Sequence, residues 1–381
     1  MKEMTSRERL LAAVRREPVD YVPCSPFINP QDYVQRIGRR YGFPFGPSRD
    51  EIVTYFVVEH GLDMVVSTPW QSDFPENVSA RVTFDAPVLT KTWTTPAGEL
   101  TASIKYDENW PHGYDIPFYT DYTIGKFVRP WLETEADLEC FGHIIKPPTK
   151  REHLNQLRFG WEATKRLAER HGLATMASIG TGLTGAQQLT DSAPICLMVI
   201  DTPDLIDAYL ELEHQTTMKN YEIALDFGVD IIRRNGFYES TDLYSPAMLE
   251  RFLKDRINAE ARVVHEAGAV IGYTLLTGYT PMLSYLATLD LDCVMTPDPF
   301  FRNESPEALR DACGKRMSFW TGPSDTVHMP WDDQVAVKKA VERTFEIFGK
   351  TGLILAACSS AKAIHPWANI ETMIQTWKEL R

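Results

Sequence analysis

Short apolar runs alternate with longer amphipathic stretches along most of this sequence, and turn-forming residues bound each run. Runs of this length are typical of buried strands, and the periodicity between them, as in 246–253, is typical of helices. Strands that alternate with helices form parallel sheets with helical crossovers. The pattern therefore predicts an α/β fold, and we expect a (β/α)8 TIM barrel spanning 1–381 as a single domain. The apolar runs are 63–67, 173–178, 230–233, 269–273, 292–295, 316–320 and 352–357.

A doubly wound parallel sheet is the alternative to the barrel. That fold often carries Gly-x-Gly-x-x-Gly directly after a strand, where the glycines let a helix approach a dinucleotide. The glycines of 180–185 have a different spacing. The sequence therefore favours the barrel.

Two segments depart from the alternation. Before the first strand, Thr5 or Ser6 can cap a helix that ends before Pro18, which predicts an N-terminal helical extension. The segment 80–105 alternates polar and apolar residues around Thr95–Gly98, which predicts an antiparallel hairpin, and 106–131 is rich in aromatic residues. We expect 80–131 to be an insertion that is either packed on the surface or forms a lid over an apolar substrate.

Charge and cysteine content exclude several classes of protein. The sequence holds 39 Lys and Arg against 52 Asp and Glu, a formal net charge of −13, so nucleic acid is not an expected partner. No apolar run is long enough to cross a bilayer and the first residues lack a signal-peptide core, so we expect a cytoplasmic protein without a membrane partner. The six cysteines are widely scattered, which argues against a disulfide scaffold or a zinc finger.

Four stretches, in order along the chain, carry a family resemblance. Met4–Arg9 with Arg16–Pro23 resembles the N-terminus of the uroporphyrinogen decarboxylase superfamily. Thr94–Leu100 is similar to a hairpin of its corrinoid-dependent methyltransferase branch, Tyr244–Phe252 to a helix start of that branch, and Pro366–Ile370 to its closing helix. The resemblance covers nearly the whole chain. It implies a barrel with its site at the carboxyl ends of the strands.

Two departures from the family pattern narrow the expected chemistry. True decarboxylases carry arginines for their many substrate carboxylates after the N-terminal motif, whereas 27–33 has none. The zinc-dependent thiol methyltransferases use His-x-Cys after one strand and a C-terminal cysteine. Cys358 resembles the latter, but 274–278 holds neither His nor Cys, so the metal site is unknown and zinc is uncertain.

Polar residues that directly follow the expected strands are the site candidates, because a barrel gathers them at one mouth. Glu239, Tyr273 and Asn235 are the expected catalytic residues: burial would raise the pKa of Glu239 enough for a general acid, and the Tyr273 hydroxyl could donate to a substrate oxygen. We expect Glu239, Tyr273 and Cys358 to converge on one cavity. The expected substrate-binding residues are Trp70, Asp73, Thr277, Asp298, Thr321 and Cys358.

The resemblance implies methyl transfer from a small methoxylated or methylated molecule, aromatic if the aromatic segment lines the site, to the cobalt of a corrinoid (cobalamin). The sequence has no corrinoid-binding Asp-x-His-x-x-Gly motif, so we expect the corrinoid on a partner protein, as in O-demethylation systems. A homodimer is a further expectation. The alternatives are a non-catalytic binding relative that has lost the metal, and a decarboxylase or lyase acting on a small substrate.

Overall fold

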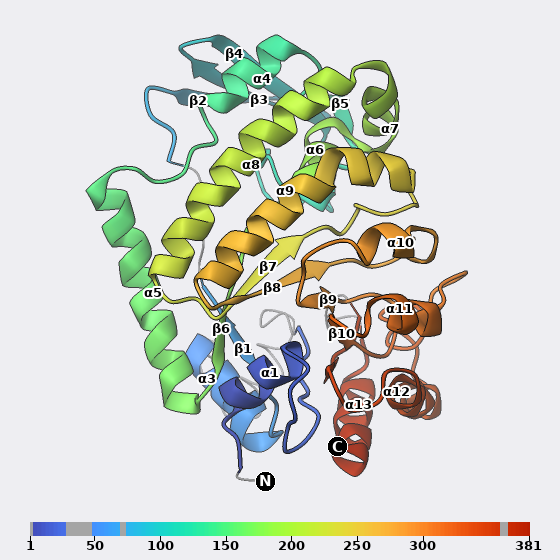
Figure 1. Cartoon of the computed structure of the whole chain (residues 1–381). Coiled ribbons are helices and arrows are strands. Elements are labelled where there is room, and N and C mark those ends of the chain that lie inside the picture. The colour runs from blue at the N-terminus through green and yellow to red at the C-terminus, as the bar shows by residue number, and fades with distance from the viewer. Residues whose placement is uncertain (1–2, 28–47, 69–73, 359–364) are drawn as a thin grey trace.

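The computed structural model describes residues 3–27, 48–68, 74–358 and 365–381. Within them lie a parallel sheet in the order β1-β6-β7-β8-β9-β10-β11 and an antiparallel sheet in the order β2-β3-β4-β5 (Figure 1). The parallel strands are β1 (Val65–Ser67), β6 (Ala174–Ser178), β7 (Ile231–Asn235), β8 (Val270–Thr274), β9 (Cys293–Met295), β10 (Ser318–Thr321) and β11 (Leu353–Leu355). The antiparallel strands are β2 (Ser79–Asp85), β3 (Val88–Thr95), β4 (Gly98–Lys105) and β5 (Phe127–Arg129).

Helices cover the outside of the parallel sheet and connect its strands. Among the helices of the described residues, none combines the length and the apolarity needed to cross a membrane. The α-helices are α1 (Ser6–Val14), α3 (Arg49–Thr54), α4 (Glu135–Gly142), α5 (Arg151–His171), α6 (Gly182–Thr190), α7 (Ser192–Asp201), α8 (Pro203–Asp226), α9 (Pro246–Glu266), α10 (Leu283–Leu286), α11 (Pro306–Cys313), α12 (Gln334–Phe348) and α13 (Trp367–Leu380). The segment η1 (Tyr55–Glu59) is a π-helix, and η2 (Asp121–Thr123) and η3 (Thr280–Met282) are 3-10 helices.

The parallel sheet curls until both of its edges meet the segment Pro23–Ser25. Leu355 of β11 donates to the carbonyl of Pro23 and accepts from the backbone N–H of Ser25, both at 2.9 Å, and Asp63, just before β1, donates to the carbonyl of Cys24 at 2.8 Å. Cys24 forms an isolated parallel bridge with Leu355. The predicted α/β class and parallel sheet are confirmed. The eightfold strand count is not, because the described residues form seven strands plus this single bridge.

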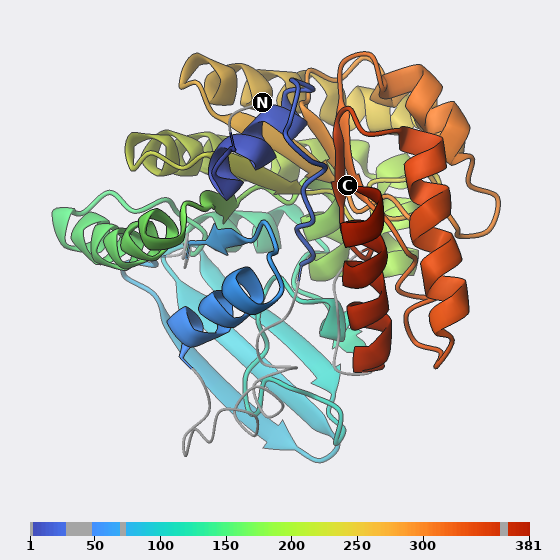
Figure 2. The ribbon, with the colours of Figure 1, turned by 90° about the horizontal axis from the view of Figure 1, so that it is seen from below.

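Helix α1 closes the amino-terminal end of the sheet. Thr5 caps it and exchanges hydrogen bonds with Glu8, which matches the capping signal in the sequence. Its apolar face packs against the strand residues that point inward. Arg15 and Arg16 donate to the carbonyls of Gly268 and Met317, which lie just before β8 and β10. Seen from below, the helix lies beside these strands (Figure 2). The carboxyl ends of the strands are therefore the end available for a site.

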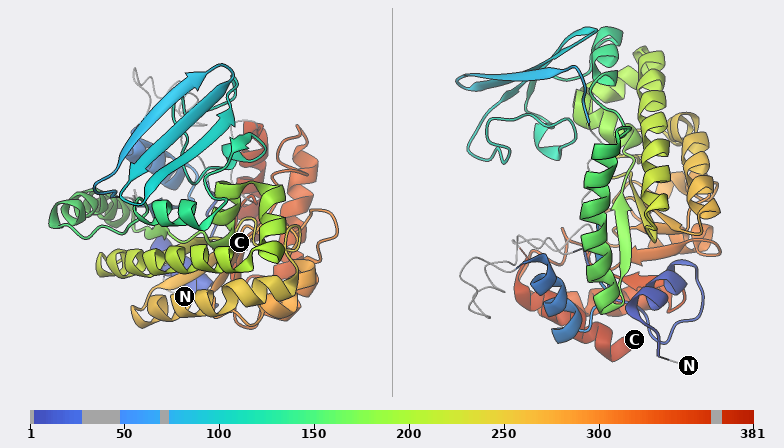
Figure 3. Two further views of the ribbon diagram at one scale, coloured as in Figure 1. Left: turned by 90° about the horizontal axis from the view of Figure 1, so that it is seen from above. Right: turned by 90° about the vertical axis from the view of Figure 1, so that its left-hand side faces the viewer.

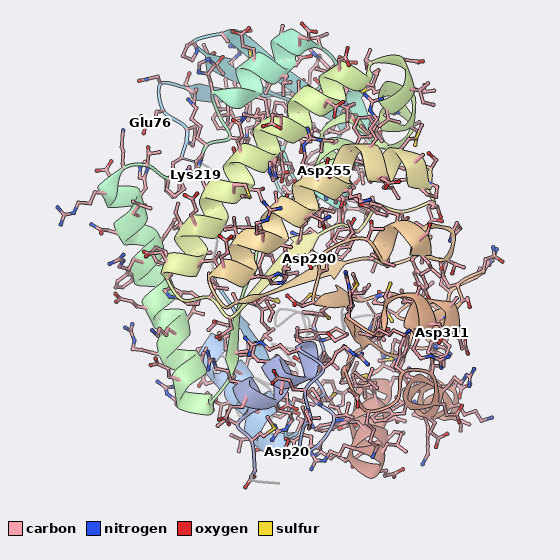
Figure 4. All side chains as sticks on the ribbon, in the orientation of Figure 1. Asp20, Glu76, Lys219, Asp255, Asp290 and Asp311 are labelled. Carbon is pink, nitrogen blue, oxygen red and sulfur yellow. The ribbon has the colours of Figure 1, made fainter. Side chains whose placement is uncertain are left out.

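Arg9 fixes α1 to the segment that follows it. Its guanidinium lies 2.6 Å from Asp20 and 2.6 Å from Asp63, and its side chain is 4% exposed. Asp20 lies near the N-terminus at the bottom of the molecule (Figure 4). The hydrogen bond from Arg9 lowers the pKa of Asp20 to about 2. Because this folded-state pKa is below the unfolded value of about 3.9, the stabilisation is present above about pH 4.

We expect Asp20→Asn to lower the free energy of unfolding by roughly 1–2 kcal/mol at pH 7, after allowance for solvent screening. As the pH falls from about 4 to about 2, the wild type loses this contribution and the two proteins converge in stability. Urea denaturation at a series of pH values measures the difference. A gap between the two proteins that stays constant down to pH 2 would contradict this account.

The insertion forms more strands than the sequence predicted. The expected turn at Thr95–Gly98 joins β3 to β4, but β2 also pairs antiparallel with β3, so 80–105 is covered by two successive hairpins in place of one. Much of the aromatic segment is packed: Trp131 is 1% exposed, and its backbone N–H donates to Leu189 of α6. Figure 3 shows this sheet projecting beyond the barrel strands. The lid function stays a prediction.

Candidate functional site

The inner face of the barrel carries a polar cluster at its carboxyl end. Ile231 and Val270 belong to the apolar cluster that fills the interior, and strand alternation places Arg233 and Thr274 on the same face, further along β7 and β8. Arg233 Nε donates to Thr274 Oγ1 at 2.9 Å, which confirms that the two side chains meet.

Aromatic rings cover the Arg233 guanidinium. Its central carbon lies 4.7 Å from the ring centroid of Phe27 and 5.3 Å from that of Phe237. Phe27 in turn stacks on Trp320 with 5.0 Å between ring centroids. Burial lowers the pKa of Arg233 to about 10, so the side chain still carries its positive charge at neutral pH. In the candidate site, a positively charged guanidinium therefore lies against aromatic rings.

The outer face of the same strands carries a second, fully buried ionic network. Arg234 donates to Glu239 at 2.5 Å and to Glu260 of α9 at 2.8 Å. The Tyr273 hydroxyl and the Leu183 backbone N–H also donate to Glu239, at 2.5 and 2.7 Å. Burial raises the pKa of Glu239, against the opposing effect of Arg234. The carboxylate therefore ties β7 and β8 to the start of α6.

The three residues predicted as catalytic fall on opposite faces of the strands. Glu239 and Tyr273 contact each other, as predicted, but both are 0% exposed and lie in the outer network. Asn235 follows the alternation of Arg233 and lines a cavity of about 170 Å³. The wall of this cavity also includes Ser178 of β6, Tyr119 of the insertion, and Glu213 and Asn220 of α8. The catalytic roles of all three stay predictions.

Cys358 lies in a third cluster, apart from Glu239 and Tyr273. Its thiol donates to the carbonyl of Gly322 at 3.1 Å and lies 3.5 Å from Thr321 Oγ1. Asp298, next to this cluster, accepts a 2.5 Å hydrogen bond from Ser324. Burial, together with the charge of Asp298, raises the pKa of Cys358 well above its usual value, so the thiol is protonated at neutral pH.

The remaining predicted binding residues are placed as follows. Thr277 is half-buried and donates to Asp242 at 2.6 Å, above β8. Trp70 and Asp73 lie outside the described residues. Substrate binding by Thr277, Asp298, Thr321 and Cys358 stays a prediction.

The donor set does not fit zinc in the described part of the chain. No group of three or more His, Cys, Asp or Glu side chains gathers there as metal ligands. Structural zinc sites use four protein ligands and catalytic zinc sites use three. No step of the proposed chemistry is therefore assigned to zinc.

Arg233 was not among the residues predicted for the site. The signal was present in Ile231–Asn235, because two successive arginines in a buried strand must face opposite sides. The apolar pattern of 230–233 predicts the strand but does not indicate a charged inner face. The sequence does not show which of the two arginines has carboxylate partners.

Comparisons with known proteins support the fold. No protein-family model matches the sequence, and the comparison with curated proteins gives no match either. Among solved structures, the chain is similar to a methyltransferase from Methanosarcina mazei, with 18% identity over 99% of both chains and a TM-score of 0.64. A weaker likeness, to a B12-independent methionine synthase from Shewanella, has 9% identity over 94% of this chain and 98% of that chain, with a TM-score of 0.47. At 18% identity, the first likeness shows a shared fold.

Proposed function

We propose that this protein is a methyltransferase that binds a small methoxylated or methylated molecule at the carboxyl end of the barrel. The observation that carries the proposal is the end-to-end likeness to the Methanosarcina mazei methyltransferase, which extends over 99% of both chains. The motif resemblance to corrinoid-dependent methyltransferases supports the same reaction. The methyl acceptor would be the cobalt of a corrinoid that a partner protein brings to the barrel mouth as the second substrate.

The reaction balances without a further redox partner. Co(I) attacks the methyl carbon in line, a cobalt–carbon bond forms, and the carbon–oxygen bond breaks with its electron pair staying on oxygen. Cobalt thereby becomes Co(III), and the leaving oxygen takes up one proton. An alkoxide or phenoxide leaves poorly, so a donor near this oxygen would accelerate the step.

Asn235 is the predicted catalytic residue that we place beside the substrate. It lines the cavity of about 170 Å³ that the carboxyl ends of β6 and β7 share with α8, and its side-chain amide can donate a hydrogen bond to the leaving oxygen while solvent supplies the proton. To Glu239 and Tyr273 we assign a positioning role, because their hydrogen bonds join β7, β8 and α6 behind the site.

The test mixes the purified protein with a corrinoid protein reduced to Co(I) and a panel of methoxylated aromatic compounds. We expect the absorbance spectrum of methyl-Co(III) to appear with at least one donor. Absence of this spectrum with every donor would overturn the proposal. Thermal stabilisation by a compound that is never turned over would instead indicate a binding protein, and release of CO2 would indicate a decarboxylase.

We expect Asn235→Ala to slow methyl transfer by about 10²-fold, the usual scale for losing one donor to a developing negative charge. Asn155→Ala is the matched control, because Asn155 lies exposed on α5. Stopped-flow absorbance at saturating donor measures the rate. Equal rates for the two variants would show that Asn235 does not contribute to methyl transfer.

A further inference from the structure

Two neighbouring arginines of β7 have opposite electrostatic surroundings. Arg234, on the outer face, has two carboxylates within 2.8 Å. Arg233, on the inner face, has no carboxylate within ion-pair distance among the described residues, and its Thr274 partner is a neutral hydroxyl. The same strand thus holds one neutralised cation and one cation without a described counter-ion.

Arg233 is half-buried, and the water that it loses makes the second situation costly. A charged side chain removed from water is normally paired, because the lost hydration must be replaced by an opposite charge or by hydrogen bonds. Arg233 donates one hydrogen bond, from Nε to Thr274, and its guanidinium lies near two aromatic rings. Within the described part of the chain, its terminal nitrogens Nη1 and Nη2 donate to no protein acceptor. These two N–H edges have the geometry that binds a carboxylate or phosphate with parallel hydrogen bonds.

The position of Arg233 points to a ligand and not to a packing role. It lies on the inner face, two residues beyond Ile231, towards the carboxyl ends of the strands where barrels bind their substrates. Thr274 fixes the orientation of the guanidinium through Nε, and the rings of Phe27 and Phe237 provide apolar surface beside it. A cation oriented in this way is ready to bind an anion before the ligand arrives.

We propose that Arg233 binds the anionic group of a small molecule that enters the barrel mouth, and that the rings of Phe27 and Phe237 pack against the apolar part of that molecule. The ligand class is a small aromatic or aliphatic acid. Its anionic group is a carboxylate, a sulfonate or a phosphonate. The inference rests on the proposed function for the location of the site, and it makes the methyl-bearing substrate an anion.

The first test uses the wild-type protein and a pair of probes that differ in charge. Isothermal titration calorimetry compares 4-methoxybenzoate with the neutral 4-methoxybenzamide. We expect the benzoate to bind at least tenfold more tightly. Benzenesulfonate and phenylphosphonate, titrated in parallel, identify the preferred anionic group. Equal affinity for the benzoate and the benzamide, or no binding of any of the three anions, would overturn the proposal.

The second test removes the charge from the site. We expect Arg233→Gln to weaken binding of the preferred anion by about ten- to a hundredfold, and to leave the affinity for the benzamide unchanged. Arg233→Lys should retain part of the affinity, because it keeps the charge without the two parallel donors. Arg262→Gln is the matched control, since Arg262 is exposed on α9. Undiminished anion binding by Arg233→Gln would overturn the assignment.

These measurements separate the inference from the proposed function. Anion binding that depends on Arg233, without methyl transfer from any donor, would support the anion site and reject the methyltransferase. Methyl transfer from neutral donors, with no preference for acids, would support the methyltransferase and reject the anion site. Should Arg233→Gln fail to fold, the comparison of charged and neutral probes on the wild type still decides the proposal.

Discussion

Arg234→Met is expected to lower the free energy of unfolding by about 3–5 kcal/mol, because it leaves buried Glu239 without its counter-ion and Glu260 with only His214 as an ionic partner. Glu239 is 0% exposed and so is Glu260, so neither can regain water without opening the space between the strands and the helices. Arg234 is shared by both carboxylates. Urea denaturation followed by circular dichroism at pH 7 measures the loss.

The same substitution one residue earlier provides the control. Arg233→Met removes a cation that has no carboxylate partner among the described residues, and it loses one hydrogen bond to Thr274 and the contacts with two rings. We expect a change of no more than about 1 kcal/mol in the unliganded protein. Losses of similar size for the two variants would contradict the difference in ion pairing between Arg233 and Arg234.

Trp320→Ala is expected to lower the free energy of unfolding by about 3–5 kcal/mol, the usual range for removing a large buried aromatic side chain. Trp320 is 0% exposed inside the barrel, where it stacks on Phe27 and donates through its indole nitrogen to the carbonyl of Ser25 at 2.7 Å. The substitution leaves a cavity beneath Phe27 and an unpaired carbonyl. Because Phe27 covers Arg233, anion binding should weaken in the same variant.

Trp320→Phe separates the two contributions. Phenylalanine keeps most of the apolar contact and loses the hydrogen bond to Ser25, so we expect a loss of about 1–2 kcal/mol. Chemical denaturation of the three proteins under one set of conditions gives the comparison. If the alanine variant were no less stable than the phenylalanine variant, the packing of Trp320 would contribute little and the account of the barrel interior would be wrong.

Patterns that act over a few residues predicted the fold well. The alternation of apolar runs and amphipathic stretches predicted the parallel sheet, and Thr5 with Glu8 predicted the start of α1. The turn at Thr95–Gly98 predicted the junction of β3 and β4. Each of these signals depends on local backbone preferences, which the folded structure satisfies.

Features that depend on residues far apart in the chain could not be predicted from the sequence. Pairing of Cys24 with Leu355 depends on a contact between the first and last parts of the barrel, so the strand pattern alone could not supply it. Burial of Glu239 is confirmed, but the partners of its carboxylate, which are Arg234, Tyr273 and the backbone N–H of Leu183, could not be predicted from the sequence. The neutralisation of Arg234 depends in part on Glu260, 26 positions further along the chain.

The joining of both sheet edges by Pro23–Ser25 has a consequence for how the protein is made. Leu355 must be present before Pro23 and Ser25 can pair, and the indole of Trp377 donates to the carbonyl of Val22, 355 positions earlier. During synthesis on the ribosome, the first strand-like segment therefore waits for almost the whole polypeptide to emerge. Nascent chains that stop before β11 would expose the open edge of β10, which makes chaperone binding during translation a direct expectation of this topology.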